Sequence, residues 1–285
     1  MVLASATGFG SLAILAKLGY GSGLGTQQML AFRFLIAAVG MLALAALAGQ
    51  NPLRLGKTRF VTLLSMGMLL YSAQSLTYFL ALRSLPASLV VLITYIYPSL
   101  VVVAGWLFLR RVIAAKHVAA LAASFVGVAM LLGGAHFQLT WALLLAVASP
   151  VVYTGYILVG ERVMGSVPAL AASAVIMVGA AIGFSLIAAV TGELSLPRSP
   201  GGWAVVFALA LFPTMLAITL FLAGLPRVGA SRAALLSTWE PMVTVMLAVV
   251  VLGDRLSIVQ VFGGLILLMA VVVVQGAQLW RPDDA

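Results

Sequence analysis

The sequence predicts an all-α polytopic membrane protein with ten transmembrane helices, arranged as two inverted five-helix repeats. The first observation is composition: 64% of the 285 residues are hydrophobic and only 7% are charged, which exceeds what a soluble domain can bury. The second is that the apolar runs are continuous and rich in Leu and Ala, unlike the alternating strands of a membrane barrel. The third is a pair of matching proline-containing runs, one in each half of the chain.

Ten apolar runs are long enough to cross a bilayer as helices, which takes about 20 residues each. Glycine, proline and polar residues separate the runs, as expected of turns. The first run is predicted to be a true span, because no basic segment precedes it. The predicted spans are residues 2–20, 27–48, 60–82, 86–109, 115–133, 138–160, 168–191, 202–223, 229–252 and 257–277.

The net charge of +9 comes from 15 Lys and Arg against 6 Asp and Glu. In a membrane protein this excess is expected of cytoplasmic loops, so it does not indicate nucleic-acid binding. If the N-terminus is inside, the inner loops and the C-terminal tail hold ten Lys and Arg, and the outer loops hold three. Both termini are therefore predicted to be cytoplasmic. The chain has no cysteine, which excludes thiolate metal sites, and no cofactor is expected.

The two halves of the chain correspond to each other. Aligning Pro98 with Pro241 also brings Thr94 onto Ser237. Because each half holds five spans, an odd number, the second half must enter the membrane the opposite way. This is the inverted-repeat plan of secondary transporters. The predicted repeats are residues 1–134 and 135–285.

The ninth run contains the only carboxylate deep in any predicted span, Glu240, directly before Pro241. Because proline has no N–H, the carbonyl of Ser237 loses its helical partner and needs another one inside the membrane. Glu240 has three interpretations: a carboxyl that couples transport to protons, a ligand for a substrate ammonium, or a structural partner of Lys17 or Arg33.

Further motifs carry a family resemblance. They are the tandem Pro98 and Glu240-Pro241, the turn at 252–257, Gly263-Gly264 before the last run, Lys17 in the first run and Arg33-Phe34 in the second. With these motifs the whole chain resembles the EamA family of the drug/metabolite transporter superfamily, and within it the YddG-type exporters of aromatic and other neutral amino acids. The resemblance implies ten helices, a bacterial inner membrane and efflux of amino acids or related metabolites.

Polar and aromatic side chains near the middle of four spans are predicted to line a substrate site. On the third span Tyr71, Gln74 and Tyr78 share one helical face, which either lines a cavity or joins helices by hydrogen bonds. Tyr97 and Tyr156 neighbour the predicted residues, and tyrosines are also common as interfacial anchors. The predicted substrate-binding set is Tyr71, Gln74, Tyr78, Thr94, Tyr95, Tyr153, Ser237, Trp239 and Glu240, with Pro98 and Pro241 as hinges.

These features predict a secondary transporter of neutral or aromatic amino acids, or of similar small metabolites, that works by alternating access. Hydroxyls, one amide and freed carbonyls suit a neutral zwitterion better than a phosphate, which would need several basic residues at mid-depth. An ATPase motif is absent, so a solute or ion gradient, such as protons, must supply the energy. The alternatives are an intramembrane enzyme, which would need a deep nucleophile or metal cluster, and a channel-type facilitator. Gly127, Gly263 and Gly264 are predicted to be helix-packing positions.

Overall fold

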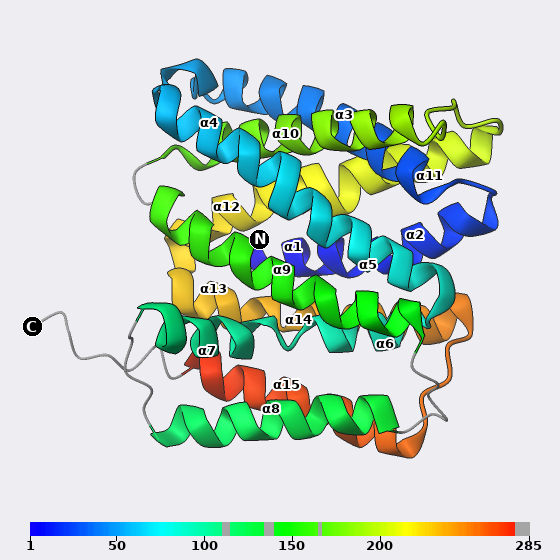
Figure 1. Cartoon of the computed structure of the whole chain (residues 1–285). Coiled ribbons are helices and arrows are strands. Elements are labelled where there is room, and N and C mark those ends of the chain that lie inside the picture. The colour runs from blue at the N-terminus through cyan, green and yellow to red at the C-terminus, as the bar shows by residue number, and fades with distance from the viewer. Residues whose placement is uncertain (110–114, 134–139, 165–166, 277–285) are drawn as a thin grey trace, which may run out of the picture.

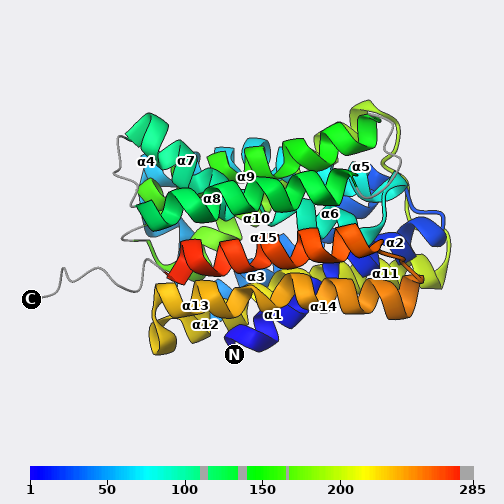
Figure 2. The ribbon, with the colours of Figure 1, turned by 90° about the horizontal axis from the view of Figure 1, so that it is seen from below.

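A computed structural model describes residues 1–109, 115–133, 140–164 and 167–276, and every regular element in these ranges is a helix. In this part of the chain nine helical segments are long and apolar enough to cross a membrane, and a shorter apolar helix covers Val118–Leu132. The long helices run side by side in two perpendicular views (Figures 1 and 2). The all-helical membrane fold predicted from the sequence is therefore confirmed.

The helical segments follow the predicted spans closely. In the first half they are α1 (Val2–Gly10) with α2 (Leu12–Gly21), α3 (Thr26–Leu47), α4 (Lys57–Ser65) with η2 (Met66–Tyr71) and α5 (Ser72–Ser84), α6 (Ala87–Thr94) with α7 (Tyr97–Leu109), and α8 (Ala115–Gly133). In the second half they are α9 (Trp141–Met164), α10 (Ala169–Val190), α11 (Pro200–Ala210) with η3 (Leu211–Leu216) and α12 (Ala217–Val228), α13 (Ala230–Ser237) with α14 (Trp239–Leu247) and η4 (Ala248–Leu252), and α15 (Ile258–Gly276). A short 3-10 turn, η1, covers Pro52–Leu55.

Three helices extend at least two residues beyond their predicted spans, among them α9, which ends at residue 164 where 160 was predicted. The third segment covers 57–84 where 60–82 was predicted, and the eighth covers 200–228 where 202–223 was predicted. Polar residues mark where a helix leaves the apolar layer, and the hydrogen-bonded helix continues past that point. The start of the predicted sixth span and the predicted boundary between residues 134 and 135 lie outside the described residues.

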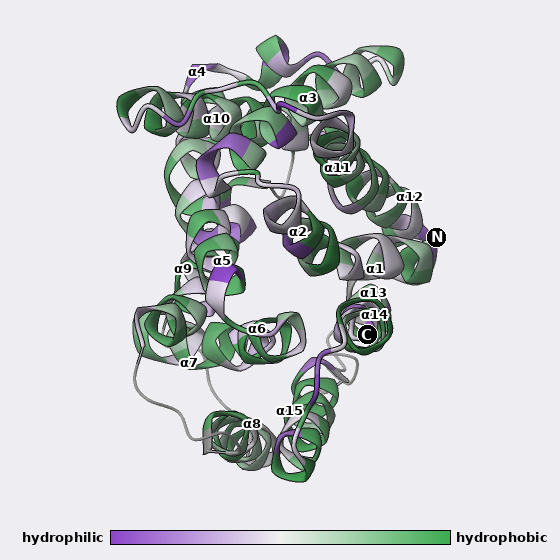
Figure 3. Ribbon diagram, turned by 90° about the vertical axis from the view of Figure 1, so that its right-hand side faces the viewer, coloured by the Kyte–Doolittle hydropathy of each residue, from purple (hydrophilic) through white to green (hydrophobic). Residues whose placement is uncertain are grey.

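Each half contributes helices that pack on the other half. Along the bundle α3 packs on α10, and α8 packs on α15. Seen end-on in Figure 3, these two pairs lie at opposite ends of the molecule, and the remaining helices lie between them. The exposed side chains of these helices are mainly large and apolar, as expected of a surface in contact with lipid.

Small residues set the closest helix contacts. A Cβ atom added to Gly127 would lie 2.7 Å from the carbonyl oxygen of Gly263, and one added to Gly264 would lie 3.2 Å from the Leu92 side chain. The predicted packing role of these three glycines is confirmed. Two further glycines also lie close to a neighbouring backbone: Cβ atoms on Gly67 and Gly179 would overlap the carbonyl oxygens of Ile176 and Leu64. At both positions the third segment and α10 touch through their backbones.

π-helical turns interrupt the third and eighth segments at corresponding places, η2 and η3. A side-chain hydroxyl bonds the carbonyl five residues earlier in each: Ser72 Oγ donates to Gly67 O at 3.0 Å, and Thr214 Oγ1 donates to Leu209 O at 2.8 Å. Such single π turns are frequent at functional sites. They widen the helix locally and place Tyr71 at the end of η2, where it turns toward the centre of the bundle.

The first span contains a break that the sequence analysis did not predict. Helix α1 ends at Gly10 and α2 begins at Leu12. The Gly10 carbonyl accepts a hydrogen bond from Thr244 Oγ1 of α14 at 2.9 Å, and Ser11 Oγ donates to Gly8 O at 2.7 Å. Hydroxyls thus bond carbonyl groups of α1 where the helix is interrupted.

Candidate functional site

The fourth and ninth segments are interrupted next to their prolines. Helix α6 ends at Thr94, and α7 restarts at Tyr97, directly before Pro98. Helix α13 ends at Ser237, and α14 begins at Trp239, two residues before Pro241. The predicted breaks are present because each proline removes one backbone donor. A hinge motion at these breaks stays a prediction.

The carbonyl freed by Pro241 is bonded by the other half of the chain. The Tyr95 hydroxyl donates to the Ser237 carbonyl oxygen at 2.8 Å and lies 3.1 Å from Glu240 Oε2. A phenol has one proton, so it donates to one of these oxygens at a time. When Glu240 is protonated it can donate to the Tyr95 oxygen, while Tyr95 continues to donate to Ser237. The two broken helices therefore meet at a hydrogen-bond network that depends on the charge of Glu240.

Two adjoining cavities lie beside this network. The first has a volume of about 130 Å³ and the second about 290 Å³. They share Phe9, Tyr71, Tyr97, Tyr153 and Glu240. The first adds Leu12, Gln74, Tyr78, Val91, Thr94 and Tyr95, and the second adds Tyr156, Ser173, Ile176, Met177, Ile218, Phe221, Leu222 and Ser237.

Tyrosine rings form a continuous wall along both cavities. Tyr71 and Tyr153 each pack against Tyr156, with ring centroids 5.4 and 5.8 Å apart. Tyr153 packs edge-on against Tyr97 at 4.8 Å, and Tyr97 packs edge-on against Tyr95 at 5.8 Å. Such contacts hold the rings in place, so the cavity presents fixed aromatic surface with hydroxyl groups at its edges.

Glu240 has no cationic partner in the described part of the chain. Its side chain bonds Tyr95, while Arg33 bonds Thr214 at 2.9 Å and Lys17 interacts electrostatically with Asp254. The interpretation of Glu240 as the structural ion-pair partner of Lys17 or Arg33 is therefore not supported by the geometry. A carboxylate in this position needs a proton or a cationic ligand.

The structure brings most of the predicted substrate-binding residues to these cavities and leaves one out. Trp239 lines neither cavity and is 41% exposed on the outside of the bundle. Adjacent residues point about 100° apart on a helix, so turning Glu240 inward turns Trp239 outward. The predicted substrate-binding residues that do line a cavity are Tyr71, Gln74, Tyr78, Thr94, Tyr95, Tyr153, Ser237 and Glu240.

Several lining residues were absent from the predicted set. Tyr156 lies three residues after Tyr153 on one helical face, a signal that could have added it. Tyr97 is the first residue of α7, after the break before Pro98, so its direction does not follow from the helical phase of α6. Phe9 and Phe221 are apolar residues in apolar helices, and the sequence has no feature that separates cavity-lining from lipid-facing phenylalanine.

The two halves of the chain both match one family model. Residues 1–133 and 140–275 match the EamA-like transporter family. The chain belongs to this family. It is thus a multi-pass membrane transporter with two EamA repeats, and the alternative of an intramembrane enzyme is set aside, because members of the family are non-enzymatic transporters.

Two relatives match this EamA-like transporter over most of its length and most of their own. The uncharacterized transporter YcbK of Bacillus subtilis is 25% identical over 90% of this chain and 85% of its own length. The uncharacterized transporter YyaM of the same organism is 24% identical over 86% of this chain and 83% of its own length. One solved crystal structure has the same fold, with a TM-score of 0.66 at 22% identity over 98% of this chain and 99% of that one.

Proposed function

We propose that this EamA-like transporter exports neutral or aromatic amino acids, or similar small metabolites, across the bacterial inner membrane by alternating access. The observation that carries the proposal is the pair of tyrosine-lined cavities at the breaks of the fourth and ninth segments. Small-molecule sites are concave, largely apolar and fitted with a few polar groups. These cavities have that composition, with the Gln74 amide, several hydroxyls and the Glu240 carboxyl as the polar groups.

The chemistry of the lining favours a small zwitterion with an apolar side chain. No Lys or Arg is among the described residues that line the two cavities, so a phosphorylated substrate would lack charge partners. Aromatic faces offer surface to an apolar side chain and can also attract an ammonium group. Hydroxyl and amide donors can bind a carboxylate.

We propose further that residues 1–134 and 135–285 move relative to each other about Pro98 and Pro241, with both termini cytoplasmic. The larger cavity is lined by residues in the first half of α10 and in the first half of α12, toward the side where the Lys- and Arg-rich loops lie. On the opposite side Asp254 Oδ2 accepts bonds from Ser88 N and Ser88 Oγ at 3.0 and 2.8 Å. This arrangement fits a transporter that is closed toward the outside.

Counterflow in proteoliposomes tests the proposal. Vesicles loaded with unlabelled phenylalanine are expected to accumulate external labelled phenylalanine, with saturation at increasing concentration, because a carrier exposes its site to one side at a time. A screen of amino acids and small metabolites as competitors then ranks the substrates. Flux that never saturates would instead support a channel-type facilitator, and a screen in which no neutral amino acid competes would contradict the proposed substrate class.

A further inference from the structure

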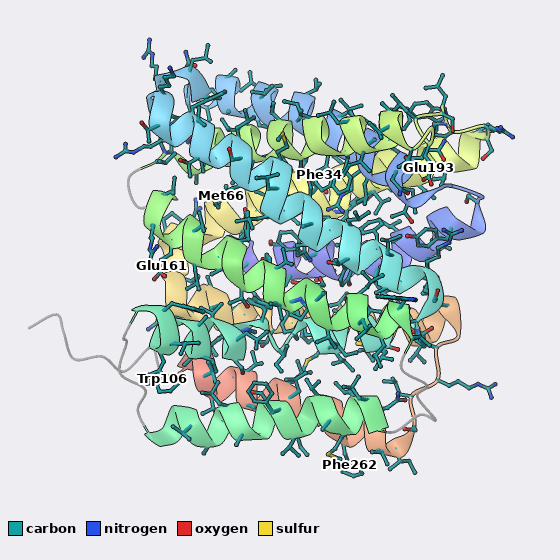
Figure 4. All side chains as sticks on the ribbon, viewed as in Figure 1. Phe34, Met66, Trp106, Glu161, Glu193 and Phe262 are labelled. Carbon is teal, nitrogen blue, oxygen red and sulfur yellow. The ribbon has the colours of Figure 1, made fainter. Side chains whose placement is uncertain are left out.

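Arg33 is a buried cation without a carboxylate partner among the described residues. Its side chain is 2% exposed, and its Nε donates to Thr214 Oγ1 of η3 at 2.9 Å. Its guanidinium carbon lies 4.7 Å from the ring centre of Phe34 and 5.6 Å from that of Phe79. Figure 4 places Phe34 inside the bundle, whereas Trp106 and Phe262 lie at its edge. Hydroxyl and ring contacts offset only part of the cost of burying such a charge.

The guanidinium lies directly behind the cavity wall. The Tyr71 hydroxyl interacts with Arg33, and the charge of Arg33 also acts on Tyr78. Both tyrosines line the first cavity. The Tyr71 ring packs edge-on against Phe34 with centroids 5.5 Å apart, which fixes the distance between the two helices at this point. Tyr71 and Tyr78 thus connect the buried cation to the cavity.

The opposite side of the same cavity carries the carboxyl of Glu240. Tyr71 and Tyr78 are under the influence of both charges, Arg33 and Glu240, yet no ion pair joins these two residues in the described part of the chain. The cavity therefore has a positive side and a negative side that remain separate. A simple amine would neutralise only the negative side, and a simple carboxylate only the positive side. A molecule with both groups matches both sides at once.

We propose that Arg33, acting through the hydroxyls of Tyr71 and Tyr78, forms the half of the site that receives the substrate carboxylate, while Glu240 receives the substrate ammonium. The inference rests on the proposed export of amino acids and specifies how the zwitterion is oriented. Arg33 is a positioning residue here: it polarises the hydroxyls that contact the substrate. Charge-assisted hydrogen bonds of this kind are stronger than neutral ones.

Three probes with the same side chain test the orientation: phenylalanine, phenethylamine, which lacks the carboxylate, and 3-phenylpropanoate, which lacks the ammonium. Dissociation constants are measured by calorimetry on the full chain in detergent micelles. Arg33→Gln is expected to weaken phenylalanine binding at least tenfold and to leave the phenethylamine dissociation constant within about threefold of the wild type, because only the ligand with a carboxylate loses the charge-assisted hydrogen bonds. Arg33→Lys is expected to restore part of the loss.

Two more variants complete the test. Tyr71→Phe keeps the ring and removes the hydroxyl, so it is expected to weaken the binding of phenylalanine more than that of phenethylamine. This variant tests the inference even if Arg33→Gln fails to fold. Lys17→Gln removes a cation of the neighbouring first span and is expected to leave the affinity ratio of phenylalanine to phenethylamine unchanged. The inference would be overturned if Arg33→Gln and Tyr71→Phe weaken the binding of phenylalanine and phenethylamine equally, or if neither variant weakens the binding of phenylalanine. Either result would leave the proposed function standing.

A different outcome separates the proposed function from the inference. If phenylalanine does not bind the wild-type protein, the strongest neutral amino acid from the counterflow screen replaces it, together with its own amine and its own carboxylic acid. Failure of every neutral amino acid to bind the wild type would overturn the proposed substrate class, and the orientation with it.

Discussion

Glu240→Gln is expected to abolish the dependence of transport on a pH gradient while leaving substrate exchange in place. The carboxyl faces the cavity beside Tyr71, Tyr78, Tyr95, Tyr97 and Tyr153, and it has no cationic partner in the described chain. It is therefore the group that can take up a proton when no substrate ammonium is present. An amide cannot do so. Loss of the charge is also expected to weaken amino-acid affinity about tenfold, since hydrogen bonds to charged groups contribute about 1.5–3 kcal/mol.

The measurement compares labelled amino-acid uptake into proteoliposomes with and without an imposed pH gradient. Two control variants accompany it. Glu193→Gln makes the same replacement in the exposed connection after α10, and Tyr95→Phe removes the hydroxyl next to Glu240 but keeps the carboxyl. Both are expected to retain the response to the gradient. Uptake by Glu240→Gln that responds to pH like the wild type would rule out proton coupling at this residue.

Gly67→Ala is expected to destabilise the folded protein strongly. A Cβ atom at Gly67 would overlap the backbone carbonyl of Ile176, and a backbone atom cannot move aside without shifting α10. Overpacking of this kind costs about 1–3 kcal/mol, occasionally more, and we expect about 3 kcal/mol because backbone atoms are involved. The shift would also displace Ile176 and Met177 from the wall of the larger cavity.

Gly155→Ala is the matched control for this prediction. Gly155 also lies within a helix, α9, but a Cβ atom there has no neighbour within 4 Å. Alanine is favoured over glycine in a helix by about 1 kcal/mol, so this variant should be as stable as the wild type or slightly more so. Thermal unfolding in detergent, followed by size-exclusion chromatography, compares the two. Equal stability of Gly67→Ala and Gly155→Ala would show that the third segment and α10 are not in backbone contact.

The helical spans could be predicted because the lipid solvent imposes one simple requirement, a continuous apolar helix about 20 residues long. The breaks before Pro98 and Pro241 could be predicted as well, since proline removes a backbone donor wherever it occurs. The breaks at Ser11 and in η2 could not. The break at Ser11 lies beside the hydrogen bond from Thr244 to Gly10, which only the packed bundle brings together. The π turn of η2 carries a bond from Ser72 to Gly67 within its own segment, and hydroxyls are too common in the spans for the sequence to single this one out.

The candidate site was predictable in composition and less so in detail. Polar residues at mid-depth indicated which segments line a cavity, and eight of the nine predicted residues line one. Trp239 does not line a cavity because it directly precedes Glu240 in α14, and adjacent helical residues point about 100° apart, so the two side chains do not face the same side. Arg33 was considered as a family motif and as a partner of Glu240, but not as part of the substrate site. Its position beside Thr214 depends on how α3 packs against η3, which the sequence pattern does not encode.

The transported amino acid is expected to bind between the two repeats, in the tyrosine-lined cavities beside Glu240. The decisive measurement is an experimental structure of the protein saturated with the best substrate from the counterflow screen. We expect density for one substrate molecule in contact with Tyr71, Tyr153 and Glu240, with its carboxylate toward Arg33. Density only at the polar surface pocket near Arg83 and Glu193, with the tyrosine-lined cavities empty, would show that the substrate binds elsewhere and rule out this site.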